Sequence, residues 1–238
     1  MRLNILALLA ITSSFATTST AQSLPKEGSF NYRFSVYCLK PLDREGLYFR
    51  DASGQYTELE LKLKSRSEVY EVKILYESPS LRFYRRQGTD NGDESMLLVA
   101  ERQVQAGIGR CLLAFYKTRP PGIKQEGDFP EFRVVEMNDS KSVFPNGSIR
   151  LLNTTGVNVI GNINGNRFEL GQDESSQPFR GLSSAKAQVS IAARGKEKYH
   201  LLYKNAIPVS EDRRSLLIIS PPAREGSLKV GGRLLIDD

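Results

Sequence analysis

Apolar and polar residues alternate along many short stretches of this chain. In FNYRFSVYCL, residues 30–39, every second residue is apolar, so one face of an extended strand would carry Phe30, Tyr32, Phe34, Val36 and Cys38. The other face would carry Asn31, Arg33 and Ser35. Because successive side chains of a β-strand point to opposite sides of a sheet, the pattern predicts a strand with one buried face.

Similar runs, rich in β-branched and aromatic residues, follow along the chain and are separated by Gly, Pro, Asn, Asp and Ser. In the first half they lie at residues 57–63, 69–76, 81–86, 96–104 and 110–117. In the second half they lie at residues 131–137, 148–153, 157–163, 167–170, 187–193, 198–204, 215–220 and 227–236. No stretch has the spacing of a long amphipathic helix. The chain is therefore predicted to be all-β.

The glycine- and asparagine-rich stretch VIGNINGNRFEL, residues 159–170, has two interpretations, a phosphate-binding loop or a turn. A phosphate-binding loop needs a helix directly after its glycines, and NRFEL instead has the character of a strand. Asn164 and Gly165 suit the two-residue turn of a β-hairpin. That turn would place Ile163 opposite Asn166, Gly161 opposite Phe168 and Val159 opposite Leu170. The sequence thus predicts a hairpin in which the Phe168 ring covers Gly161.

The chain changes character at residues 118–130, TRPPGIKQEGDFP, where three prolines interrupt the alternation. We interpret this stretch as a boundary between two tandem antiparallel β-sandwich modules of the immunoglobulin-like kind, residues 24–125 and 126–238.

Three pairs of segments suggest that these modules repeat one another: 46–61 with 156–170, 81–86 with 199–204, and 110–122 with 214–226. The alternative is a chance resemblance between β-rich sequences.

The first residues form an apolar run behind a single basic residue, Arg2, and end in a tract of small residues. Ser19 and Ala21 fit the small-residue pattern of a cleavage site, so residues 1–21 are predicted to be a signal peptide. A membrane anchor is the weaker interpretation, because the apolar run is shorter than the roughly 20 residues that a spanning helix needs. The mature chain is expected to be exported, to the periplasm, the cell envelope or the medium, with no transmembrane segment of its own.

Cys38 and Cys111 are the two cysteines of the chain. An even number of cysteines in an exported chain favours a disulfide, and two buried free thiols are the alternative. Their spacing does not match a metal site, and no metal or other cofactor is expected.

The formal net charge of +6 becomes +5 when Arg2 leaves with the leader, which favours acidic partners. Lysines and arginines are interspersed with acidic residues, however, and the densest basic cluster is Arg82, Arg85 and Arg86. We interpret most of this charge as a mixed solvated surface, and binding of acidic polymers through the arginines near Arg82 as a less favoured class. No nucleic-acid partner is expected.

Catalytic chemistry has little support in the sequence. The single histidine, His200, lies in a strand-like run between Tyr199 and Leu201, and no hydrolase or zinc-enzyme motif occurs. The acidic loops at residues 88–95 and 171–176 lack the spacing of a calcium loop. No catalytic or metal-binding residue is therefore assigned.

The ten tyrosines are the available stacking surfaces for carbohydrate, although most lie in alternating strands and are more simply explained as packing residues. The sequence favours a non-catalytic binding, scaffold or envelope-associated protein whose partner is a protein or a surface polymer. The alternative is an enzyme that acts on glycans or envelope polymers through carboxylates.

Overall fold

The computed structural model describes residues 28–39, 46–62, 65–88, 94–117, 131–182, 185–195, 198–222 and 227–237. These residues form 15 β-strands in four sheets and no helix, which confirms the all-β prediction. Within the described ranges there is accordingly no apolar helix of membrane-spanning length. The predicted leader, residues 1–21, and the proline-rich stretch 118–130 lie outside these ranges.

The first half of the chain forms two sheets of four strands each. Sheet A contains β1 (Ser29–Cys38), β4 (Tyr70–Leu75), β7 (Cys111–Lys117) and β8 (Phe132–Asn138), in the order β4-β1-β7-β8. Sheet B contains β2 (Leu47–Arg50), β3 (Tyr56–Leu59), β5 (Ser80–Gly88) and β6 (Glu94–Gln103), in the order β3-β2-β5-β6.

The second half forms the other two sheets. Sheet C contains β9 (Ile149–Asn153), β14 (Arg214–Ser220) and β15 (Gly231–Asp237), in the order β15-β14-β9. Sheet D contains β10 (Val159–Ile163), β11 (Asn166–Leu170), β12 (Lys186–Arg194) and β13 (Tyr199–Pro208), in the order β11-β10-β12-β13.

The strand pairing of the first half recurs in the second. In each half the first strand runs parallel to the penultimate one, β1 with β7 and β9 with β14, while the other neighbours are antiparallel. The expectation of purely antiparallel sheets is therefore wrong. β4 pairs with the edge of β1 that faces away from β7. The corresponding edge of β9, which faces away from β14, forms only two isolated bridges among the described residues, Ile149 with Phe179 and Leu152 with Ser175.

The predicted sequence similarities agree with this recurrence in part. Residues 46–61 and 156–170 contain the equivalent hairpins β2-β3 and β10-β11, and the pair that contains β7 and β14 is also equivalent. The third pair is not equivalent, because residues 81–86 lie on β5, whereas residues 199–204 lie on β13, the counterpart of β6.

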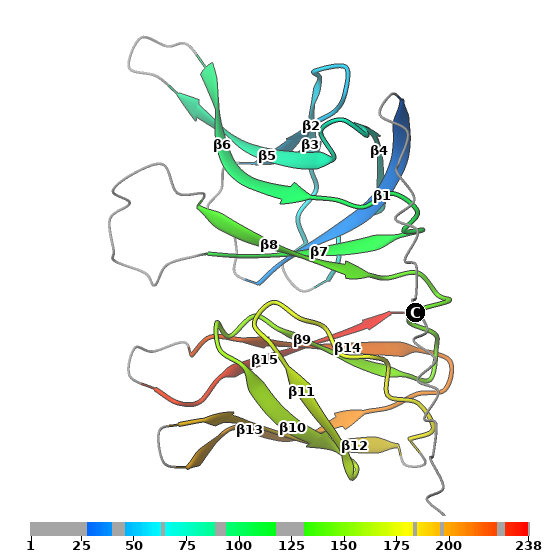
Figure 1. Ribbon diagram of the computed structural model, residues 1–238, viewed down its shortest axis with the longest axis vertical. Helices are drawn as coiled ribbons and strands as arrows, with labels where there is room; N and C mark the ends of the chain where they lie inside the picture. Colours follow the sequence, from blue (N-terminus) through cyan, green and yellow to red (C-terminus); the bar gives the residue numbers. More distant parts are fainter. Residues whose placement is uncertain are drawn as a thin grey trace, which may run out of the picture.

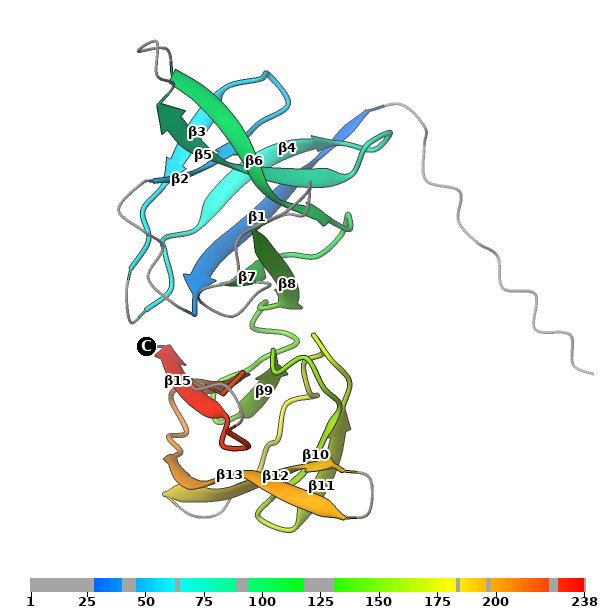
Figure 2. The ribbon, with the colours of Figure 1, turned by 90° about the vertical axis from the view of Figure 1, so that its left-hand side faces the viewer.

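The four sheets stack in the order B, A, C, D along the long axis of the molecule (Figures 1 and 2). One hydrophobic cluster, with Phe34 and Phe83, fills the space between sheets A and B. A second, with Ile191 and Leu217, lies between sheets C and D. A third cluster joins sheets A and C and contains Tyr37, Leu112, Ala114, Val135, Met137, Phe144, Leu152, Leu216, Ile218 and Leu235.

The strands in the middle of the stack are buried on both faces. From Phe34 to Cys38, every residue of β1 is buried, including Tyr37 and also Ser35, which the alternation had assigned to an exposed face. The prediction that only one face of this strand is buried holds for its first part alone. Its second part is covered by sheet B on one face and by sheet C on the other. Continuous buried runs of this kind are expected of strands covered on both sides.

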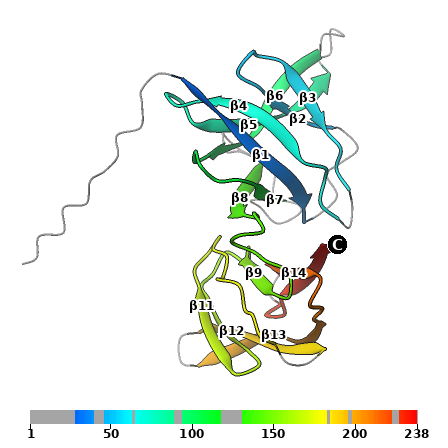
Figure 3. The same cartoon turned by 90° about the vertical axis from the view of Figure 1, so that its right-hand side faces the viewer.

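β8 belongs to the sheets of the first half. The sequence assigned residues 131–137 to the second module, but Phe132–Asn138 pairs along its length with β7 in sheet A. Residues 139–148 then lead from sheet A to sheet C, as the green trace shows in Figure 3.

Cys38 and Cys111 are free thiols, so the predicted disulfide does not form. β1 and β7 are neighbours, but Cys111 lies opposite Phe34 and Cys38 lies opposite Phe115. The two cysteines are thus four positions out of register, about 13 Å at roughly 3.3 Å per residue, well beyond the Cα distance that a disulfide can bridge. The alternative of two buried free thiols is correct.

The hairpin predicted at residues 159–170 is confirmed in turn type and register. Its strands pair Val159 with Leu170, Gly161 with Phe168 and Ile163 with Asn166. Asn164 and Gly165 both have positive φ, 46° and 90°, as the two-residue turn requires.

Candidate functional site

Sheet B is the terminal layer of the stack, so one of its faces packs on sheet A and the other is turned away from the core (Figure 1). Leu47 and Phe49 of β2 are buried, as are Leu81 and Phe83 of β5. The intervening residues therefore point outward. Together with Tyr56 of β3 they form a surface that we call the tyrosine–arginine face: Tyr48, Arg50, Tyr56, Arg82, Tyr84 and Arg86.

Cross-strand pairing brings these side chains together. Tyr48 lies opposite Tyr84, and Arg50 opposite Tyr56. The rings of Tyr56 and Tyr84 meet edge to face with centroids 5.1 Å apart. The Arg50 guanidinium carbon lies 5.5 Å from the Tyr56 ring centroid, within the range of a cation–π contact.

The rest of the face repeats this arrangement of rings and guanidinium groups. The Arg86 guanidinium lies 5.3 Å from the centroid of Tyr48. Arg82 forms an exposed ion pair with Glu101, at 2.9 Å between Nε and Oε1. Tyr56 is 41% exposed and all three arginines are exposed, so a ligand can reach both an aromatic ring and guanidinium groups.

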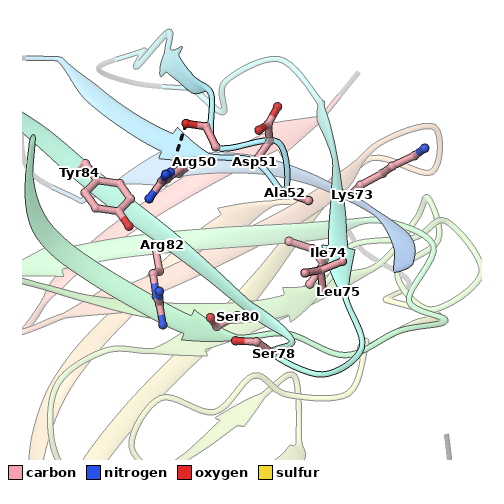
Figure 4. A pocket seen from close by; sticks show the side chains of 11 residues that line it. Arg50, Asp51, Ala52, Lys73, Ile74, Leu75, Ser78, Ser80, Arg82 and Tyr84 are labelled. Carbon is pink, nitrogen blue, oxygen red and sulfur yellow. Dashed lines mark hydrogen bonds between the residues drawn. The ribbon is translucent and has the colours of Figure 1, made fainter. Parts of the chain in front are cut away.

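A polar pocket of about 250 Å³ adjoins this face. Arg50, Arg82 and Tyr84 line one side, and Lys73 lies on β4 across from them (Figure 4). The carboxylate that lines the pocket, Asp51, accepts hydrogen bonds from the Ser53 hydroxyl and from two backbone amides of the β2-β3 turn. The Ser53 hydroxyl, followed by the amides, lowers the pKa of Asp51, which suits a turn-stabilising carboxylate and not a general acid.

The arginine cluster predicted from the sequence is divided between two faces. Arg82 and Arg86 lie on the tyrosine–arginine face, but Arg85 points the other way, is only 14% exposed and lies 3.3 Å from the Glu131 carboxylate. Arg50 of β2, which lies outside that predicted cluster, lies beside Tyr84 on the tyrosine–arginine face. Sequence reasoning missed Tyr48, Arg50 and Tyr56, although the alternation LYFR at residues 47–50 already places Tyr48 and Arg50 on one face.

A second group of charges lies where the two halves meet. Asp139 follows β8 and is fully buried, with Oδ2 2.5 Å from Arg66, 3.2 Å from Arg214 and 3.3 Å from Arg110. Asp237, at the end of β15, lies 3.0 Å from Arg66 and 2.5 Å from Arg214. We call these five residues the junction cluster, since it joins segments of both halves.

The acidic loop at residues 171–176 also contacts the first half. The Asp173 carboxylate accepts a 2.5 Å hydrogen bond from the Tyr116 hydroxyl and lies 2.7 Å from Arg133. Burial, and then this carboxylate, raise the pKa of Tyr116. Calcium binding by this loop is not supported, because the Asp173 carboxylate is already paired with Tyr116 and Arg133. The other acidic loop, residues 88–95, lies largely outside the described ranges.

The side chain of Glu136 on β8 is 8% exposed and contacts three polar side chains inside the first half. It accepts hydrogen bonds from the Tyr32 hydroxyl at 2.8 Å and from the Cys111 thiol at 3.2 Å, and lies 3.5 Å from Arg102. Burial raises the pKa of the Cys111 thiol to about 12, so it acts here as a hydrogen-bond donor. The nucleophile in cysteine chemistry is the thiolate, which this site disfavours.

His200 lies on β13, an edge strand of sheet D, between the exposed Tyr199 and Leu201. It belongs to no group of three or more His, Cys, Asp or Glu side chains that could hold a metal ion, and the described part of the chain has no such group elsewhere.

No protein-family model matches this chain, and no curated protein matches it either.

Proposed function

We propose that this protein is an exported, non-catalytic binding protein whose tyrosine–arginine face binds an anionic surface polysaccharide. The observation that carries the proposal is the interleaving of Tyr48, Tyr56 and Tyr84 with arginines on an outward-facing sheet surface. Aromatic rings stack on the apolar faces of sugars, and guanidinium groups pair with carboxylate or sulfate.

We further propose that the two halves are immunoglobulin-like modules. The recurrence of strand pairing from β1–β8 to β9–β15 supports this division, with the transition between modules at residues 139–148. The proposed binding surface would then belong to the outer sheet of the first module.

The environment of the carboxylates gives less support to the alternative, a glycan-cleaving enzyme. A carboxylate mechanism needs two acidic groups that converge on a cleft. Asp139, Asp173 and Asp237 are instead paired with arginines, and Asp51 is held in a turn. The pocket beside the tyrosine–arginine face presents Arg50, Arg82 and Lys73 beside its single acidic residue.

The test is a titration of the protein with polygalacturonate, with dextran as a neutral polymer and single-stranded DNA as a second polyanion. We expect binding to polygalacturonate that weakens with added salt, because exposed ion pairs are screened. The double variant Tyr56→Ala/Tyr84→Ala should lose about tenfold or more in affinity, as expected when aromatic anchors of a binding surface are truncated.

Tyr199→Ala is the matched control, since Tyr199 is 56% exposed on sheet D, at the other end of the stack. Equal losses in the control and the double variant would refute the assignment of the face. Tighter binding of the DNA than of polygalacturonate would refute the polysaccharide as its ligand.

A further inference from the structure

The junction cluster borders a pocket of about 480 Å³, a volume typical of small-molecule sites. Five cationic side chains line it: Lys62, Arg66, Arg110, Lys141 and Arg214. They come from both halves of the chain, since the first three precede β7 and the last two follow β8. The pocket is thus separate from the tyrosine–arginine face on sheet B.

The positive charges of this pocket exceed the negative charges beside them. Asp139 and Asp237 pair with the arginines, and Glu68 lies 3.9 Å from Lys62. Among the described residues, these five cations against three carboxylates leave a formal charge of +2. Lys141 is exposed and has no acidic partner among the described residues, so it contributes to this excess.

A buried guanidinium group of the pocket also has a hydrogen-bond donor without a partner among the described residues. The Arg66 side chain is only 7% exposed, and its Nη2 has no hydrogen-bond partner in the described part of the protein. The Nε of Arg110, by contrast, is already occupied by its ion pair with Asp139 Oδ2 at 3.3 Å. A buried donor without an acceptor destabilises the folded protein, and an anionic ligand would supply the missing acceptor.

We infer that this pocket binds a small molecule that carries a doubly charged tetrahedral oxoanion, a phosphate or a sulfate. The charge of such a group matches the +2 excess, and its oxygens accept hydrogen bonds from guanidinium and ammonium groups. The pocket is large enough to hold a molecule attached to the oxoanion. This inference is independent of the proposed polysaccharide binding.

The test is isothermal titration of the full mature chain with inorganic phosphate, inorganic sulfate, glucose 6-phosphate and glucose, at constant ionic strength set with sodium chloride. We expect the three oxoanion ligands to bind and glucose not to bind. Glucose 6-phosphate binding more tightly than inorganic phosphate would support a phosphorylated small molecule as the ligand class. The reverse order would overturn the attached molecule in favour of the free ion.

Lys62→Ala/Lys141→Ala should lower the affinity for the oxoanions about tenfold, because each lysine contributes a charge-assisted contact. Both side chains lie outside the buried ion pairs, so the fold should persist. Lys204→Ala, an exposed lysine on β13, is the matched control and should bind like the unaltered protein. The inference is overturned by an absence of heat with every oxoanion, or by affinity that the double variant retains in full.

Discussion

Gly161 occupies a position on β10 where no side chain fits. A Cβ atom there would lie 2.2 Å from Cζ of Phe168 and 2.6 Å from the backbone oxygen of Ser190. Because the carbonyl belongs to the neighbouring strand β12, the contact cannot be relieved by a rotamer change of Phe168 alone. We expect Gly161→Ala to lower the free energy of unfolding by about 1–3 kcal/mol, the usual cost of overpacking a core.

Gly88, at the end of β5, provides the control for this substitution. Among the described residues nothing lies within 4 Å of an added Cβ there, and its φ is not in the left-handed region. Gly88→Ala should therefore be neutral or slightly stabilising. Urea unfolding of both variants measures the difference, and equal midpoints would show that the Phe168 ring does not constrain Gly161.

The raised pKa values of the two buried thiols predict that the free energy of unfolding depends on pH. Burial raises the pKa of Cys38 and of Cys111 to about 12, so the folded state holds both thiol protons more tightly than the unfolded state does. The stabilisation is complete below about pH 9, near the ordinary thiol pKa, and is lost as the pH rises towards 12. Cys38→Ala should show a smaller decrease in unfolding free energy between pH 9 and pH 11 than the unaltered protein.

Alkylation without a reductant tests the same pair chemically. At pH 8 iodoacetamide should label neither thiol in the folded protein and both in denaturant, since both are buried and protonated. Intact mass measures the number of labels. Failure to label in denaturant would indicate a disulfide and would contradict the register of β1 and β7.

At the scale of elements, the features that depend on neighbours in the sequence could be predicted. The hairpin at residues 159–170 follows from the Asn-Gly turn and from alternation around it, so its register was predictable residue by residue. The strand at residues 30–39 shows the limit, because alternation cannot reveal a second sheet packed on the side of Ser35 and Tyr37. The continuous apolar runs of β7 and β14 were the available signal that these strands are covered on both faces.

The candidate sites were less predictable, since both depend on strand pairing over long separations. The tyrosine–arginine face needs the β2-β5 register, which joins residues 47–49 with 83–85. The junction cluster brings Arg66, Asp139 and Arg214 together from three separate segments. Local periodicity does not show which distant segments of the chain come into contact. Arg82, Arg85 and Arg86 were therefore predicted to form one basic cluster, although Arg85 lies on the opposite face of β5 and pairs with Glu131.

At the scale of the whole molecule, the halves are joined by an apolar cluster and by buried charge. The apolar cluster packs Leu112 and Met137 of sheet A against Leu216 and Ile218 of sheet C. The junction cluster lies beside it, with Asp139 between arginines from either half. Because both contacts must break when the halves separate, we expect the two halves to unfold in one cooperative transition.

Asp139→Asn tests this coupling most directly. The substitution removes the charge that compensates the buried guanidinium groups of Arg66 and Arg214, which are 7% and 3% exposed. Removing one partner of a buried ion pair costs about 3–5 kcal/mol, so the variant should unfold at a much lower denaturant concentration. Tyrosine fluorescence can follow the transition, because the chain has ten tyrosines and no tryptophan.

Glu101→Gln provides the comparison, since it breaks the exposed pair with Arg82 and should cost at most about 1 kcal/mol. If the junction also couples the halves, Asp139→Asn should split the single transition into two, and the protein should become susceptible to proteolysis at residues 139–148. A loss of stability no greater than that of Glu101→Gln, with one sharp transition retained, would mean that the apolar cluster alone holds sheets A and C together.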